Sequence, residues 1–278
     1  MQHSPFELRA RDGVILQAQA LEPADAQQAI LGIVHGLGEH SARYAAIVQS
    51  FTRAGIVVVT YDQRGHGCTG GRLPPFATLL DDIDLLIAEM RRRGDWPQFL
   101  FGQSLGGDLV LNYALRRRPA LAGVIASSPL LTPAVPPPAW KLTLARVLSL
   151  VWPGCPLPSG VSPDGLSHDP DVVRRYREDP LVHGHVSAIL GTSMLDAGAW
   201  ALEHADQLTL PLLLMHGSGD RLTSAESSRL FASRAVSLCT LQIWEGLFHE
   251  LHFEPEREQV LDCIHDWIGQ VLQIADGR

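Results

Sequence analysis

The chain lacks long apolar runs: none of its 278 residues belongs to an uninterrupted stretch of about 18 apolar residues that could cross a bilayer. We expect no signal peptide, because residues 1–6 have neither a basic start nor an apolar centre, and Glu7 and Arg9 follow at once. The apolar fraction of 46% is ordinary for a globular protein. Together these observations predict a soluble protein that works in the cytoplasm.

Cysteine is scarce, with four residues and no Cys-x-x-Cys pair. Four scattered cysteines in a chain of this length exclude a disulfide framework and favour a reducing compartment. Basic residues are outnumbered, with 22 lysines and arginines against 30 aspartates and glutamates, and the net charge is −8. Because the basic residues form no long block, the composition argues against nucleic acid as a partner and against electrostatic docking on an anionic membrane.

Short apolar runs alternate with helix-like segments along most of the chain. After a predicted hairpin around Asp12-Gly13, fully apolar runs are typical of strands buried on both faces of a parallel sheet. We therefore expect an α/β fold with a mostly parallel sheet of about eight strands and helices on both faces. The predicted strands after the hairpin cover 29–34, 56–61, the run before Ser104, 122–128, 212–216 and 240–244, and the predicted helices cover 41–54, 76–93, the segment after Ser104, 224–235 and 255–272.

The alternation breaks at Pro129. From there to about residue 208, prolines recur and helical stretches lie between them. We interpret this segment as an inserted helical cap, so that residues 1–128 and 209–278 are two parts of one core and residues 129–208 are the cap. One stretch of the cap, 139–152, is apolar on nearly every side.

The stretch Gly102-Gln103-Ser104-Leu105-Gly106-Gly107 predicts a nucleophile elbow. An apolar strand ends at Gly102, and helical spacing begins after Ser104. A strand that turns sharply into a helix forces its corner residue toward positive φ, and the flanking glycines leave room for that strain. The serine hydroxyl would then be exposed in front of a helix N-terminus. The alternative is a serine in an ordinary turn of small residues.

Two further strands end in residues that could activate this serine. A serine needs a base to take its proton, and the base needs a carboxylate to hold its tautomer. Asp220 follows the apolar run 212–216, and His249 follows the run 240–244. The order Ser104, Asp220, His249 is that of the α/β-hydrolases, so we interpret the three as a catalytic triad. Taken alone, Asp220 could instead cap the next helix, and His249 could be a plain loop histidine.

An oxyanion hole needs two backbone amides. We expect one from Leu105 and the other from Leu37, in the glycine-containing loop after the first parallel strand, where His35 is expected to be structural. The predicted mechanism needs no cofactor and no metal. His249 and His252 lie three residues apart and so lack the spacing of a His-Glu-x-x-His zinc site, and no dinucleotide-binding Gly-x-Gly-x-x-Gly follows that strand.

Four blocks together resemble the monoacylglycerol lipase family of the α/β-hydrolase superfamily, which includes lysophospholipase-like serine hydrolases. They are His35-Gly36-Leu37-Gly38-Glu39-His40-Ser41, Tyr61-Asp62-Gln63-Arg64-Gly65-His66-Gly67, Gly102-Gln103-Ser104-Leu105-Gly106-Gly107 and His216-Gly217-Ser218-Gly219-Asp220-Arg221. The resemblance implies an α/β-hydrolase fold and hydrolysis of monoacylglycerols to fatty acid and glycerol. It also implies that Glu39, Arg43 and His252 hold the glycerol end of the substrate.

Alternatives remain open for several of these implications. Glu39 and Arg43 are four residues apart at a helix start and could simply pair with each other, and His252 could be only a neighbour of the base. The stretch 139–152 could line an acyl tunnel, present an apolar face to a membrane or lipid droplet, or only form the inner surface of the cap. A broad carboxylesterase or a lysophospholipase would use the same triad, and a ligand-binding protein without activity could keep the fold. The oligomeric state, monomer or homodimer, is left open.

Overall fold

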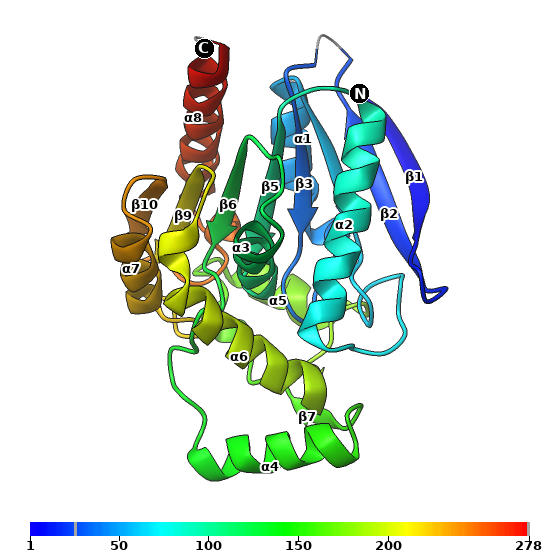
Figure 1. Cartoon of the computed structure of the whole chain (residues 1–278), viewed down its shortest axis with the longest axis vertical. Coiled ribbons are helices and arrows are strands. Elements are labelled where there is room, and N and C mark those ends of the chain that lie inside the picture. Colours follow the sequence, from blue (N-terminus) through cyan, green and yellow to red (C-terminus); the bar gives the residue numbers. More distant parts are fainter. Residues whose placement is uncertain (25–26, 277–278) are drawn as a thin grey trace.

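The computed structural model describes residues 1–24 and 27–276, and its centre is an eight-stranded sheet (Figure 1). The strand order is β1-β2-β4-β3-β5-β6-β9-β10. β1 and β2 form an antiparallel hairpin, β2 pairs antiparallel with β4, and every further pair is parallel. The mostly parallel sheet of about eight strands is thus confirmed. The strands are β1 (Gln2–Arg9), β2 (Ile15–Glu22), β3 (Ala29–Val34), β4 (Ile56–Tyr61), β5 (Gln98–Gln103), β6 (Gly123–Ser127), β9 (Leu212–Gly217) and β10 (Cys239–Trp244).

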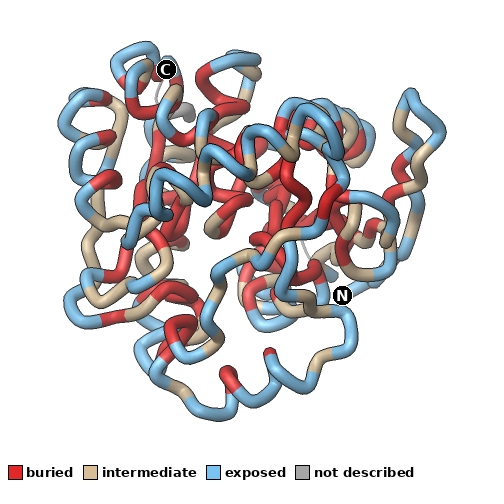
Figure 2. The backbone as a smooth tube through the Cα atoms, turned by 90° about the horizontal axis from the view of Figure 1, so that it is seen from below, coloured by how far each residue is buried: buried red, intermediate tan, exposed pale blue. Residues whose placement is uncertain are grey.

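Helices cover both faces of the sheet, as the alternation predicts. Alternate residues of each buried strand point to opposite faces. In β3, Ile30 and Val34 join a cluster with α2 and α3, whereas Leu31 and Ile33 join a second cluster with α1 and α8. Figure 2 shows the buried segments in red in the interior, with exposed segments in pale blue around them. The helices are α1 (Ala45–Arg53), α2 (Phe76–Arg93), α3 (Leu105–Arg117), α7 (Ala225–Arg234) and α8 (Arg257–Asp276).

Two predicted helices differ in detail from the structure. The segment predicted as one helix over 41–54 begins as a 3-10 turn, η1 (Ser41–Tyr44), and becomes α-helical only at Ala45. The last helix begins at Arg257 rather than at Pro255, because Pro255 and Glu256 form a turn and the Arg257 amide donates to the Glu254 carbonyl. None of the described helices is long and apolar enough to span a membrane.

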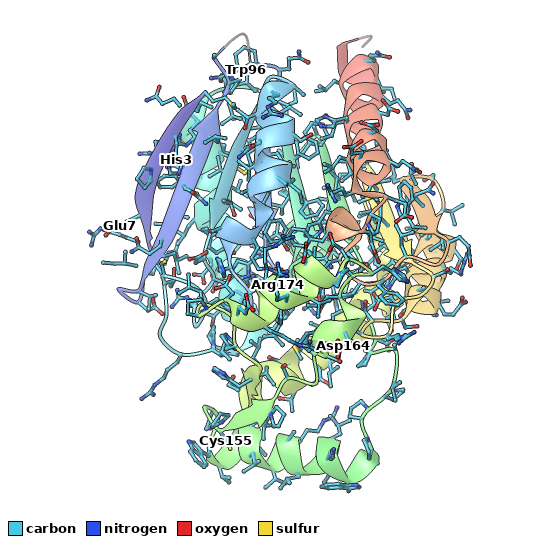
Figure 3. The ribbon with its side chains drawn as sticks, turned by 180° about the vertical axis from the view of Figure 1, so that it is seen from behind. His3, Glu7, Trp96, Cys155, Asp164 and Arg174 are labelled. Atoms are coloured by element: carbon cyan, nitrogen blue, oxygen red, sulfur yellow. The ribbon has the colours of Figure 1, made fainter. Side chains whose placement is uncertain are left out.

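Residues 129–208 form a layer of short elements at the carboxyl ends of the parallel strands. Helix α6 lies between the sheet and α4, which is the element farthest from the sheet (Figure 1). Figure 3 shows Asp164 and Arg174 on the segment between the strands and α4. The elements are α4 (Ala139–Val151), β7 (Pro156–Pro158), η2 (Pro163–Gly165), α5 (Pro170–Glu178), β8 (His185–Ser187), α6 (Ala188–Glu203) and η3 (Ala205–Gln207).

Candidate active site

Ser104 occupies the corner between β5 and α3. Its φ of 56° and ψ of −115° confirm the predicted positive φ. The glycines allow two close backbone contacts: a Cβ added to Gly102 would lie 2.1 Å from the Gly106 carbonyl oxygen, and one added to Gly106 would lie 2.1 Å from the Val34 oxygen. A positive φ at a partly exposed, non-glycine corner residue is a strained conformation that is frequent at functional sites. The elbow is therefore built by close packing that only glycine permits.

Asp220 and His249 meet at the adjacent strand ends. His249 Nδ1 lies 2.7 Å from Asp220 Oδ2, and both side chains are buried. Because the carboxylate only accepts, Nδ1 carries the proton and the neutral imidazole keeps a free acceptor at Nε2. This is the tautomer in which a histidine can take a proton from a serine hydroxyl.

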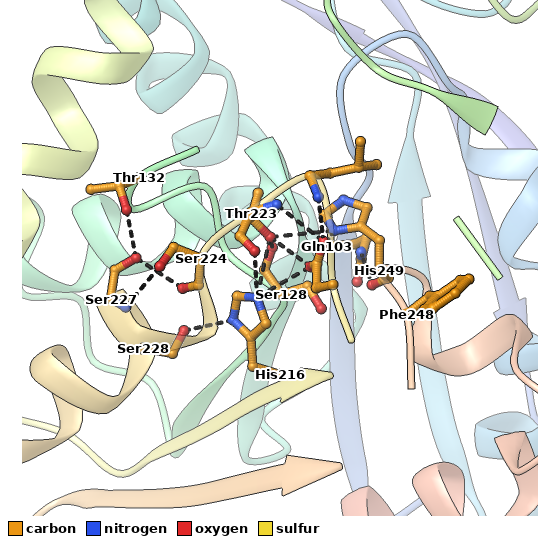
Figure 4. Close-up of polar contacts among 12 residues, drawn as sticks. Gln103, Ser128, Thr132, His216, Thr223, Ser224, Ser227, Ser228, Phe248 and His249 are labelled. Carbon is orange, nitrogen blue, oxygen red and sulfur yellow. Dashed lines mark hydrogen bonds and ion pairs between the residues drawn. The ribbon is translucent and has the colours of Figure 1, made fainter. Parts of the chain in front are cut away.

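A dense set of donors surrounds the Asp220 carboxylate. Oδ1 accepts from the amides of Leu222 (2.7 Å) and Thr223 (3.0 Å), and Oδ2 accepts from the Thr223 hydroxyl (2.8 Å). His216 Nε2 lies 3.1 Å from Oδ2, and its Nδ1 lies 2.7 Å from the Ser228 hydroxyl (Figure 4). Helix α7 is capped by Ser224, whose side chain accepts from the Ser227 amide, and not by Asp220.

These contacts set the protonation of the pair. Burial alone would favour neutral Asp220, but His249 and His216 hold the pKa of the carboxyl well below its usual range. Burial opposes the charged form of His249, yet the Asp220 carboxylate outweighs burial and raises the pKa of the imidazole above its ordinary value of 6.5. The carboxylate thus stays ionised and favours the imidazolium that a general base becomes.

Ser104 and His249 are linked through the residue that precedes the serine. The Gln103 side chain, which Figure 4 shows beside His249, donates to the His249 carbonyl oxygen at 3.0 Å. Among the described residues, no hydrogen bond joins the Ser104 hydroxyl to His249 itself. Such bonds are often long in a free enzyme and shorten when substrate binds.

The two amides expected to form the oxyanion hole have no hydrogen-bond acceptor in the described part of the chain. Neither the Leu37 nor the Leu105 amide donates to another group within residues 1–24 and 27–276. The loop that carries Leu37 lies against the serine, since a Cβ added to Gly36 would be 3.4 Å from Ser104 Cβ. His35 stays within this region, as expected: its Nε2 accepts from the Gln63 amide at 2.9 Å, so Nδ1–H donates to the Gly36 oxygen at 2.8 Å.

Glu39 and Arg43 form the mutual ion pair that their spacing allowed. Arg43 Nη1 lies 2.6 Å from Glu39 Oε2, and both side chains are buried. The opposite Glu39 oxygen accepts from the Gly36 amide and from the Tyr44 hydroxyl, each at 2.6 Å. Arg43 also binds both oxygens of Glu250 at 2.8 Å.

His252 is buried among aromatic rings. It stacks on Tyr44 with ring centroids 5.1 Å apart, and neither ring nitrogen has a partner in the described part of the chain. Burial lowers its pKa to about 3, so the ring is neutral.

Three residues that contact the candidate site residues were not predicted from the sequence. Thr223 and His216 hold Asp220, and Glu250 holds Arg43. The position of Glu250, directly after the candidate base, was the one available signal. Its partner lies 207 residues away, so no local spacing could reveal the pair.

Backbone hydrogen bonds, among other contacts, join residues 129–208 to the candidate site. The Leu130 amide donates to the Ser104 oxygen at 3.0 Å, and the His183 amide donates to the Gly38 oxygen at 2.9 Å. The Glu250 amide donates to the Leu166 oxygen at 2.8 Å. These bonds tie this layer to the serine corner, to the Leu37 loop and to the histidine loop.

Comparison with known proteins identifies the family of the chain. The Hydrolase_4 family, described as serine aminopeptidase S33, matches residues 25–256. The chain is 32% identical over 262 residues to a monoacylglycerol lipase of Mycolicibacterium smegmatis, covering 92% of this chain and 93% of that protein. It is 34% identical over 281 residues to an uncharacterized abhydrolase domain-containing protein of Dictyostelium discoideum, covering 99% of this chain but only 30% of that longer protein.

Structural comparison gives the same assignment. The crystal structure of Paleococcus ferrophilus monoacylglycerol lipase superposes with a TM-score of 0.85 at 34% identity, covering 93% of this chain and 98% of that one. The fold is therefore the α/β-hydrolase fold, and the resemblance to monoacylglycerol lipases is confirmed. Through the match over residues 25–256, the chain belongs to the Hydrolase_4 family of α/β-hydrolases.

Proposed function

We propose that this protein is a serine hydrolase of carboxylic esters and that it acts on monoacylglycerols. The observation that carries the proposal is the buried 2.7 Å bond between His249 and Asp220 beside a strained, partly exposed serine. The relatives at 32% and 34% identity that are named monoacylglycerol lipases support the substrate class.

The mechanism follows from the roles of these groups. The Ser104 hydroxyl attacks the ester carbonyl while His249 Nε2 takes its proton, and Asp220 stabilises the resulting imidazolium. The amides of Leu37 and Leu105 donate to the negative carbonyl oxygen. The imidazolium then protonates the leaving glycerol oxygen, and an acyl-enzyme remains on Ser104. Water, deprotonated by His249, releases the fatty acid. These steps need no metal and no cofactor.

A survey of substrates with one preparation tests the substrate class. Monoacylglycerols, diacylglycerols, triacylglycerols and lysophospholipids of one acyl length are compared by kcat/KM. We expect the highest value for monoacylglycerols, with p-nitrophenyl esters as a reference for the intrinsic reactivity of the triad. A preference for triacylglycerols or for lysophospholipids would contradict the proposed substrate and favour a broader lipase or a lysophospholipase.

We also propose that α4 docks transiently on a lipid surface. None of its residues is buried, and four large apolar side chains at or beside it are strongly exposed: Trp140 (66%), Leu150 (83%), Val151 (74%) and Trp152 (60%). Exposed apolar groups that gather on one element mark interaction surfaces. The net charge of −8 disfavours anionic membranes, so the expected partner is a zwitterionic or neutral lipid surface.

Replacing Leu150 and Val151 together by aspartate should weaken binding to phosphatidylcholine vesicles at least tenfold. Each aliphatic side chain that leaves the lipid forfeits about 1.5–3 kcal/mol, and 1.4 kcal/mol is a factor of ten. Vesicle co-sedimentation measures the change. Val236→Asp is the matched control, because Val236 is 77% exposed but lies after α7. Equal binding of the double variant and the control would refute docking through α4.

A further inference from the structure

A buried cluster of two carboxylates and one guanidinium lies beside the candidate triad. Arg43 binds Glu39 through Nη1 at 2.6 Å and binds Glu250 with both terminal nitrogens at 2.8 Å. At most 9% of any of the three side chains is exposed. The guanidinium carbon also lies 4.7 Å from the Tyr176 ring centroid and 5.0 Å from that of Phe253. Such a bidentate, ring-flanked site suits arginine and no other cation.

The cluster joins two loops that the mechanism needs. On one side, Glu39 accepts from the Gly36 amide at 2.6 Å, which directs the backbone that leads into Leu37. On the other side, Glu250 directly follows His249 in the chain. The Arg43 guanidinium therefore connects the loop that carries Leu37 to the loop that carries His249. Tyr176 of helix α5 packs against the same guanidinium.

We propose that Arg43 and Glu250 are positioning residues, which hold the Leu37 amide and His249 in one geometry and surround the His249 imidazolium with net negative charge. This inference rests on the proposed ester hydrolase mechanism. It assigns the buried pair to the positioning of catalytic groups and not to contact with glycerol. A shift of about 1 Å in a reacting group can lower the rate about 10²-fold. Contacts that hold the two loops in place therefore preserve the rate.

The charges around His249 predict the sign of the electrostatic effect on this ring. Asp220, Glu250 and Glu39 act directly on the charge of His249, His252 is coupled to it, and His216 and Arg43 bind the carboxylates among them. Two carboxylates against one guanidinium leave the cluster one negative charge in excess. Burial raises the pKa of the Glu250 carboxyl, while the two bonds from Arg43 favour its ionised form. Glu250 and Glu39 both add to the raised pKa of His249.

Glu250→Gln tests the electrostatic part. Glutamine keeps the size of the side chain but removes the charge, so the pKa of His249 should fall. A base works only when neutral, so the acidic decline of kcat/KM should begin at a lower pH in the variant than in wild type. At pH 8, kcat should fall severalfold, because the imidazolium that forms in the transition state loses a neighbouring negative charge.

Arg43→Met tests the positioning part, with Arg43→Lys as the conservative variant. We expect kcat to fall about 10²-fold for both p-nitrophenyl butyrate and a monoacylglycerol, with partial rescue by lysine, which keeps the charge but loses the fork. Arg53→Met, at the exposed end of α1, is the matched control and should match wild type. If KM rises for the monoacylglycerol alone and kcat holds, Arg43 contacts glycerol and the positioning role is wrong.

An NMR titration of the His249 ring separates this inference from the proposed function. The signal is assigned by its loss in His249→Gln, and the titration needs no substrate. If wild type hydrolyses no ester, the proposed function fails. If the pKa of His249 is the same in Glu250→Gln as in wild type, the electrostatic role fails even in an active enzyme. Thermal unfolding of each variant shows whether the titrated protein is folded. A change in the pKa of His249 is counted only for a folded variant.

Discussion

Ser104→Ala is expected to lower the rate of ester hydrolysis by about 10⁶-fold, the cost of removing a triad nucleophile in other serine hydrolases. No other group in the mechanism can form the acyl-enzyme. Replacing a strained, positive-φ serine by alanine should leave the fold intact, since alanine adds no volume at this corner. Steady-state kinetics with p-nitrophenyl butyrate, normalised to folded protein, measure the change.

Ser233→Ala is the matched control for this experiment. Ser233 is exposed on α7, away from the serine corner, and its hydroxyl donates to the Leu230 carbonyl of its own helix. The control should keep wild-type activity. If Ser104→Ala still hydrolyses esters at more than about one thousandth of the wild-type rate, Ser104 is not the nucleophile. A serine hydrolase without its nucleophile retains a much smaller fraction of the wild-type rate.

Asp220→Asn should lower kcat by about 10⁴-fold with a small effect on KM. Asparagine can turn its NH₂ toward His249 Nδ1, which stabilises the tautomer that cannot accept a proton at Nε2. The amide oxygen can still accept from Leu222 and Thr223, so the loop keeps its shape. Kinetics at pH 8 give the value, and unfolding curves show that the protein remains folded.

Asp81→Asn serves as the control for the charge change. Asp81 lies on α2 with a side chain that is 66% exposed and, among the described residues, pairs only with Arg117. A kcat for Asp220→Asn within tenfold of this control would mean that His249 does not depend on the Asp220 carboxylate. The buried pair would then be structural, and another acid would have to orient the base.

The sheet and the strand-end residues were predictable because their signals are local. A fully apolar run such as 29–34 indicates a doubly buried strand without knowledge of its neighbours, and the structure places β3 over the same residues. Glycines flanking Ser104 predicted a positive φ for steric reasons, and the value is 56°. Asp220 and His249 each follow a parallel strand, so both were expected at the carboxyl edge of the sheet, where they form a hydrogen bond.

Other features depend on tertiary partners and could not be predicted. Helical spacing allowed an ion pair between Glu39 and Arg43, but only the fold shows that Glu250 adds the second carboxylate. The capping role of Asp220 was a fair alternative by local rules, and it failed because His249 and Thr223 use the carboxylate while Ser224 caps α7. Likewise, the apolar composition of 139–152 did not reveal that none of the residues in α4 is buried.

The central claim is that Ser104 is the activated nucleophile of a serine hydrolase, and covalent labelling with phenylmethylsulfonyl fluoride tests it most directly. The reagent sulfonylates a serine whose neighbouring base removes its proton. Intact mass spectrometry followed by peptide mapping should show one adduct per chain, on the peptide that contains Ser104, with parallel loss of activity and no adduct in Ser104→Ala. An unlabelled wild-type protein that continues to hydrolyse ester, or an adduct on another residue, would contradict the account.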